Sequence, residues 1–194
     1  MIVVADTTPL NYLVLIRHED LLPRLFGRVL IPPAVAAELR RQETPHPVRL
    51  WLAQSPSWLQ VQPLRSQPDQ GLDYLDPGGR EAIALAEELK ADQILLDEAD
   101  ARQEAAHRKL PFIGTLGVLR RAAQLDLIDL PSALARLQQT TFYVDPELIG
   151  RCWTKTLSGQ IADDRTHRRV GVRHESDDLR GSLFCGLKPS VVIR

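Results

Sequence analysis

The sequence predicts an α/β fold in which helices cover both faces of a central parallel sheet. Short apolar runs without polar alternation, such as residues 2–5 and 29–31, are typical of strands that are buried on both faces. Segments with apolar residues at helical spacing follow these runs. This alternation of strand and helix is the pattern of βαβ units, which place their strands in parallel.

The composition of the chain limits the classes of protein to which it can belong. A chain of 194 residues with 44% hydrophobic and 25% charged residues is typical of one globular domain plus an extension. The formal net charge of −1 provides no global basic field, so any binding to nucleic acid must depend on a local patch. Two distant cysteines, Cys152 and Cys185, fit a reducing compartment. Without a secretory leader or a membrane-spanning run, we expect a soluble cytoplasmic protein.

The first strand, residues 2–5, ends at Asp6. We expect Thr8 to cap the following helix and Pro9 to occupy its first position. Asp6 then stands at the carboxyl end of the strand without a capping role. In open α/β sheets this edge is where ligands bind, so Asp6 is a candidate for chemistry.

A second unit combines a strand at 29–31 with a helix at 34–41, and a further strand is expected at 58–61. Glu38 lies on this helix, three residues after Val35 and beside its apolar stripe. A solvated helix glutamate is the ordinary alternative to a functional role for Glu38.

The next helix is predicted at 77–89, with Asp76 as its N-cap and Pro77 at its first position. Glu81 borders the apolar face of this helix. A favourable interaction with the positive end of the helix dipole, worth about 0.3–1 kcal/mol, explains Glu81 as well as a functional role does.

A strand at 93–96 ends at Asp97, which repeats the position of Asp6 at a strand end. Asp97 could instead cap the helix predicted at 99–109. A short strand at 112–113 and helices at 118–125 and 131–139 complete the expected wrapping of the sheet.

From about residue 154 the chain has no sustained periodicity and a mildly basic mixture of charges. We therefore expect a domain at 1–153 and a disordered or loosely attached tail of uncertain structure at 154–194. His167 and His174 in this tail are interpreted as solvated side chains, because no further ligand completes a zinc site around them.

Four carboxylates could converge at one edge of the sheet. Two carboxylates about 4 Å apart repel by roughly 4 kcal/mol at an effective dielectric constant near 20. A divalent cation removes this cost, and a set of oxygen ligands suits Mg²⁺ or Mn²⁺ better than zinc. Such a centre can activate water and clamp a phosphate, so hydrolysis of a phosphodiester is the natural chemistry. The four candidates are Asp6, Glu38, Glu81 and Asp97.

Five segments contain the four acids and the residues around them. They are Val-Val-Ala-Asp-Thr-Thr-Pro-Leu at 3–10, Pro-Pro-Ala-Val-Ala-Ala-Glu-Leu at 32–39, Leu-Asp-Pro-Gly-Gly-Arg-Glu-Ala-Ile-Ala-Leu-Ala at 75–86, Ile-Leu-Leu-Asp-Glu-Ala-Asp-Ala-Arg at 94–102 and, without an acid, Ile-Gly-Thr-Leu-Gly-Val-Leu at 113–119. In this order they resemble the PIN domain. Within that family the chain is most similar to the branch related to VapC-type toxins, and the similarity covers roughly residues 1 to 150.

The resemblance implies a three-layer α/β/α fold and a Mg²⁺- or Mn²⁺-dependent endoribonuclease. By matching motif positions, Asp6 and Asp97 are expected as the primary metal ligands, and Glu38 and Glu81 as the acids that complete the site. One departure from the family pattern is Gly79, where related sequences often have an acidic residue directly after Pro-Gly.

Supporting roles follow from the same resemblance. Thr8 occupies the place of a Ser or Thr that supports the first aspartate, and Glu98 is a fifth candidate acid. We expect contacts to the RNA backbone from Arg80 and Arg102 near the rim. The sequence has no aromatic cluster for stacking bases, so it indicates no sequence specificity.

Several hypotheses remain open. The leading one is a ribonuclease, including the case of a toxin restrained by a small antitoxin that occludes the acidic cleft; the resemblance also implies a homodimer. The second is a catalytically incomplete PIN-like module that binds RNA or a protein partner. A phosphotransferase is weaker, because such enzymes usually place a second acid where this chain has Thr8. No Gly-x-Gly-x-x-Gly follows the first strand, which argues against a Rossmann cofactor site.

Overall fold

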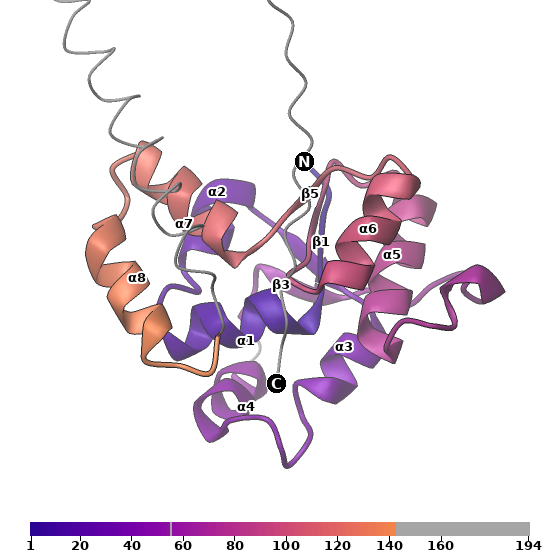
Figure 1. The fold of residues 1–194 in the computed structure, drawn as a ribbon. Coiled ribbons are helices and arrows are strands. Elements are labelled where there is room, and N and C mark those ends of the chain that lie inside the picture. Colours follow the sequence, from indigo (N-terminus) through magenta and orange to yellow (C-terminus); the bar gives the residue numbers. More distant parts are fainter. Residues whose placement is uncertain (55, 143–194) are drawn as a thin grey trace, which may run out of the picture.

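A five-stranded parallel sheet forms the centre of the molecule in the computed structural model, which describes residues 1–54 and 56–142 (Figure 1). The strand order is β3-β2-β1-β4-β5, and every neighbouring pair is parallel, which confirms the predicted fold class. In the register of the sheet, Val3 pairs with both Val29 and Gln93. The strands are β1 (Val3–Ala5), β2 (Val29–Ile31), β3 (Leu59–Val61), β4 (Gln93–Leu95) and β5 (Phe112–Ile113).

Helices cover both faces of this sheet, as expected of a three-layer α/β/α fold. Apolar residues of α1, α2, α4, α7 and α8 join one core cluster, and those of α5 and α6 join the other (Figure 1). In the part of the chain that the structure describes, no helix is long and apolar enough to cross a bilayer. The helices are α1 (Thr7–Leu15), α2 (Leu21–Phe26), α3 (Pro33–Glu38), α4 (His46–Ala53), α5 (Pro77–Leu89), α6 (Ala99–His107), α7 (Thr115–Gln124) and α8 (Leu130–Gln138), with a 3₁₀ turn, η1 (Gln70–Leu72).

Strand β1 is buried on both faces of the sheet, which explains why its sequence is an unbroken apolar run. Successive side chains of a strand point to opposite faces of the sheet. Val3 and Ala5 accordingly belong to one core cluster and Val4 to the other, and all three are fully buried. Helix α3 packs against α5 as well as contributing to the first cluster, so it joins the two helical layers beside the sheet.

Helix boundaries differ from the prediction in two places that matter for the site. Helix α1 begins at Thr7, so the prediction of Thr8 as N-cap is wrong and Asp6 itself holds that position. The Asp6 side chain nevertheless makes no capping hydrogen bond. Helix α7 begins at Thr115, three residues earlier than expected, because Asp97, two residues after β4, accepts hydrogen bonds from Thr115 in its first turn. The predicted domain boundary and tail lie outside the described residues.

Candidate metal centre

Two predicted acids follow neighbouring strands at the centre of the sheet. Ala5 of β1 pairs with Leu95 of β4, and Asp6 and Asp97 come after these strands. The N–H of Asp6 donates to the carbonyl of Leu95 at 3.1 Å, which extends the pairing to the site. The chain runs from β1 outward to β3 and then returns to the other side of β1, so this edge is the topological switch point where α/β sheets bind ligands.

Three carboxylates come together here: Asp6, Glu38 and Asp76, which we call the acidic trio. One oxygen from each lies within 4.8 Å of the others. Oxygen ligands bind Ca²⁺ or Mg²⁺ at about 2.0–2.6 Å, so oxygens on opposite sides of one ion stand about 4–5 Å apart. The spacing of the trio therefore fits a single shared cation.

Asp6 is the member of the trio that most needs a partner. Its side chain is 1% exposed, and neither carboxylate oxygen has a hydrogen-bond partner among the described residues. Burial raises the pKa of Asp6 well above its usual value, and the negative charge of Asp76 raises it further. The N–H of Thr7 opposes part of this rise without forming a well-aligned hydrogen bond. A buried carboxylate without a donor is costly, and a cation bound between these oxygens would supply the missing partner.

Glu38 is held in place by two donors. The hydroxyl of Thr7 donates to Oε2 at 2.6 Å, and the N–H of Gly78 donates to Oε1 at 3.1 Å. The side chain is 8% exposed, so the solvated glutamate considered from the sequence is not what the structure contains. A Cβ at residue 78 would stand 2.6 Å from Oε2, and only glycine therefore permits this close approach.

Asp76 was not predicted as a site residue, because a capping role was enough to explain an aspartate at this position. It does cap α5, and its Oδ1 accepts from the N–H of Gly79 at 3.0 Å. The same partly exposed carboxylate also reaches Asp6 and Glu38. A signal was present in the sequence, because the glycines after Pro77 allow the start of α5 to approach other chain segments closely.

Asp97 is fully engaged by other residues. Its Oδ1 accepts from the Arg102 guanidinium and from the N–H of Thr115, both at 2.9 Å, and its Oδ2 accepts from the Thr115 hydroxyl. Burial raises the pKa of Asp97, while Thr115 and Arg102 oppose the rise. Asp97 does not cap α6, as the alternative from the sequence had it, but holds the first turn of α7. It lies outside the trio, so its role as a primary metal ligand stays a prediction.

Glu81 also lies outside the trio. Its Oε2 accepts from the N–H of Ala34 at 2.9 Å, which ties α5 to the start of α3. This contact satisfies a backbone donor that the first turn of a helix leaves free. Glu81 thus binds a backbone N–H in this structure, and its expected role as a metal ligand stays a prediction.

Glu98 lies beside the trio and Thr8 supports it weakly. The Thr8 hydroxyl stands 3.5 Å from Glu98 Oε1, the limit of a hydrogen bond. Burial raises the pKa of Glu98, and the charges of Asp76 and Glu38 raise it further. The Thr8 hydroxyl is directed to Glu98 in this structure, while the Thr7 hydroxyl donates to Glu38, and support of Asp6 by Thr8 stays a prediction.

The two arginines expected to contact RNA are paired within the protein. Arg80 donates to Asp73 at 3.0 Å. Arg102 donates through Nε to the carbonyl of Leu96 at 2.8 Å and through its guanidinium to Asp97. Neither guanidinium is free in this structure, and their contact with nucleic acid stays a prediction.

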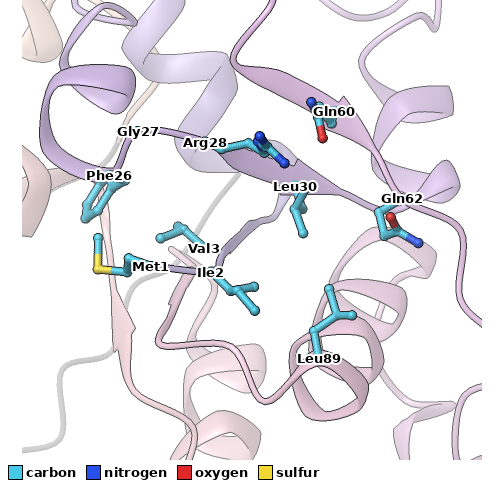
Figure 2. Close-up of a pocket in the computed structure, with 10 residues that line it drawn as sticks. All are labelled: Met1, Ile2, Val3, Phe26, Gly27, Arg28, Leu30, Gln60, Gln62 and Leu89. Atoms are coloured by element: carbon cyan, nitrogen blue, oxygen red, sulfur yellow. The ribbon is translucent and has the colours of Figure 1, made fainter.

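A cavity of about 340 Å³ adjoins the trio, with Glu38 and Asp76 among its lining residues. A second cavity, of about 540 Å³, lies near the start of β1 and is lined mainly by apolar and amide side chains (Figure 2). Figure 2 shows Leu30 and Leu89 beside Gln60 and Gln62 there, with Arg28 as the charged group. No carboxylate is among the residues that line this second cavity.

The fold and the acidic edge of its sheet define an α/β protein with a candidate cation site. The chain matches the family DUF3368, described as a PIN domain, over residues 2–158, and it therefore belongs to the PIN domain family. A solved structure, a PilT N-terminus domain protein, SSO1118, from the hyperthermophilic archaeon Sulfolobus solfataricus P2, is 18% identical with a TM-score of 0.47. The similarity covers 63% of this chain and 93% of that one. No curated protein matches the chain.

Proposed function

We propose that this protein is a metal-dependent endoribonuclease that hydrolyses RNA phosphodiester bonds. Membership of the PIN family, whose members are generally metal-dependent nucleases, supports the proposal. The observation that carries it is Asp6, a buried carboxylate that lies beside two further acids and whose two oxygens have no hydrogen-bond partner in the part of the chain that the structure describes. An all-oxygen set of this kind suits Mg²⁺ or Mn²⁺.

In the proposed site, Asp6, Glu38 and Asp76 would hold the cation. A bound divalent cation lowers the pKa of water and neutralises charge on a phosphate. Thr7 and Gly78 keep the Glu38 carboxylate oriented through their two hydrogen bonds. These contacts fix the acid before a ligand arrives, which limits the cost of reorganisation.

Glu98 is the proposed general base. Burial is the main cause that raises its pKa, and it brings the group closer to the range in which a carboxylate exchanges protons efficiently. It would accept a proton from the attacking water at one of its carboxylate oxygens. The long contact with Thr8 leaves that carboxylate less tightly held than Glu38.

Other parts of the proposal are expectations from the sequence and from family resemblance. We retain a domain that ends near residue 153, a cytoplasmic homodimer and a toxin–antitoxin pairing. The resemblance also implies Asp97 and Glu81 as ligands, whereas their present contacts favour structural roles, and single variants of each acid separate the two. A specific observation favours the alternative of a catalytically incomplete binding module: Asp97, Arg80 and Arg102 are all engaged in internal contacts.

The experiment that tests the nuclease is incubation of the purified protein with a panel of structured and single-stranded RNAs, with and without Mg²⁺ or Mn²⁺. The wild type should cleave only in the presence of the cation, and the Asp6→Asn variant should not cleave. Asp100→Asn is the matched control, because Asp100 is exposed in the first turn of α6. Absence of cleavage by a wild-type protein that binds RNA would favour the binding module.

A further inference from the structure

The cavity beside the acidic trio is a groove with its own polar chemistry. It has a volume of about 340 Å³, within the range of pockets that bind small ligands. Glu38 and Asp76 belong to both the groove and the trio, so the two are continuous. The remaining lining residues are Asn11, Arg41, Glu43, Thr44, Pro45 and Pro77.

Arg41 is the only cationic side chain among these lining residues. It is exposed, and its guanidinium has no hydrogen bond or ion pair with any described residue. The adjacent Arg40 differs, because its guanidinium donates to the carbonyl of Ala36 at 3.0 Å and it does not line the groove. Arg41 is therefore available to an anion that enters beside the trio.

Asn11 provides a second polar group in the groove. It lies on α1, and its amide makes no hydrogen bond within residues 1–54 and 56–142. Its Oδ1 is buried without a partner. The groove thus combines an unpaired guanidinium, which donates to phosphate oxygens, with an unpaired amide oxygen, which accepts from the hydroxyl or amino groups of a nucleotide.

We propose that Arg41 binds a backbone phosphate of single-stranded RNA next to the phosphate that is cut, with the adjoining nucleotide lying in this groove against Asn11. The inference rests on the proposed nuclease function. A polyanion that approaches Glu38, Asp76 and Glu43 meets repulsion, and an arginine can offset it with parallel hydrogen bonds to phosphate oxygens. Arg41 is thus a binding residue whose guanidinium, unlike those of Arg80 and Arg102, need not leave an internal partner to bind phosphate.

The test measures the binding of a short fluorescein-labelled oligoribonucleotide by fluorescence anisotropy, in an Asp6→Asn background that prevents cleavage. Adding Arg41→Ala should raise Kd about tenfold and reduce the slope of log Kd against log salt by about one. Arg41→Lys should recover part of the affinity, because it restores the charge without the planar fork. Arg40→Ala is the matched control and should leave Kd and the salt slope unchanged.

Steady-state cleavage by proteins with an intact Asp6 gives a second readout. Arg41→Ala should raise KM and leave kcat nearly unchanged, because Arg41 acts on binding. If Arg41→Ala and Arg40→Ala behave alike while the wild type still cleaves RNA, the assignment of Arg41 fails and the nuclease stands. If the parent variant binds no oligoribonucleotide and the wild type cleaves none, both proposals fail.

Discussion

Gly78 and Glu38 are in direct contact at the candidate metal centre. The N–H of Gly78 donates to Glu38 Oε1 at 3.1 Å, and a Cβ on residue 78 would stand 2.6 Å from Oε2 and 3.1 Å from Asp6 Oδ1. The start of α5 therefore forms one wall of the acidic trio. A methyl group on residue 78 would occupy space that the Glu38 and Asp6 carboxylates now fill.

The first prediction concerns Gly78→Ala. The methyl group should push the Glu38 carboxylate out of place and weaken Mn²⁺ binding at least tenfold. Alanine is a better helix former than glycine by about 0.8–1.0 kcal/mol, and this gain should offset the cost of displacing Glu38, so the free energy of unfolding should change little. Calorimetry of Mn²⁺ binding and urea unfolding measure the two effects.

Gly71→Ala is the control for this variant. A Cβ at residue 71 would lie 3.4 Å from its nearest neighbour, which is ordinary contact. Unchanged Mn²⁺ affinity in Gly78→Ala would show that the close approach of Gly78 does not matter for the site.

The second prediction concerns Asp6 and pH. Burial raises the pKa of Asp6 in the folded state above the ordinary value of 3.8, so the folded chain holds more protons than the unfolded chain between these two pKa values. For this group, the free energy of unfolding of the metal-free protein is highest below 3.8 and falls as pH rises through the folded pKa. Asp6→Asn should remove this fall and stabilise the metal-free protein at neutral pH by about 1–3 kcal/mol.

Urea unfolding of the metal-free wild type and Asp6→Asn across pH checks this. Part of the fall should persist in the variant, because the pKa of Glu98 and that of Asp97 are also raised. A variant less stable than the wild type at neutral pH would indicate that Asp6 has a favourable partner in the folded protein.

The third prediction separates Asp76 from Asp97. Asp76→Asn should reduce Mn²⁺ affinity strongly, since Asp76 belongs to the trio, and the neutral amide can still cap α5. Asp97→Asn should instead lower the free energy of unfolding by about 1–3 kcal/mol, because Arg102 and Thr115 lose their charged acceptor. The same calorimetric and unfolding measurements on both variants distinguish the roles. A larger loss of Mn²⁺ affinity in Asp97→Asn would restore Asp97 as the ligand that family resemblance implies.

The fourth prediction concerns Glu81. Glu81→Ala should destabilise the protein by about 0.5–1.5 kcal/mol, because the N–H of Ala34 loses its acceptor. RNA cleavage and Mn²⁺ affinity should stay close to those of the wild type. Unfolding curves and cleavage rates would test this, and a complete loss of cleavage by a folded variant would make Glu81 a site residue after all.

The sequence was a good guide to the parts of the structure that are set locally. Apolar runs without alternation marked the buried strands, and Asp76 with Pro77 marked the start of α5. The positions of Asp6 and Asp97 followed from the strand ends, because parallel strands place their carboxyl ends at one edge of the sheet.

The remainder depended on contacts between distant parts of the chain. Asp97 is bound by Thr115, eighteen positions later, and this contact starts α7 early. The Glu81 carboxylate accepts a hydrogen bond from the N–H of Ala34, forty-seven positions earlier in the chain. Asp76 joined the trio because α5 packs against α3, which no periodicity in the sequence specifies.

Isothermal titration of the metal-free wild type with Mn²⁺ tests the central claim most directly, with Asp6→Asn and the exposed control Asp100→Asn titrated in parallel. We predict saturable binding to the wild type and to Asp100→Asn, and loss of binding in Asp6→Asn with its fold intact by circular dichroism. Equal binding by all three proteins, or no binding by the wild type, would contradict a cation site at the acidic trio.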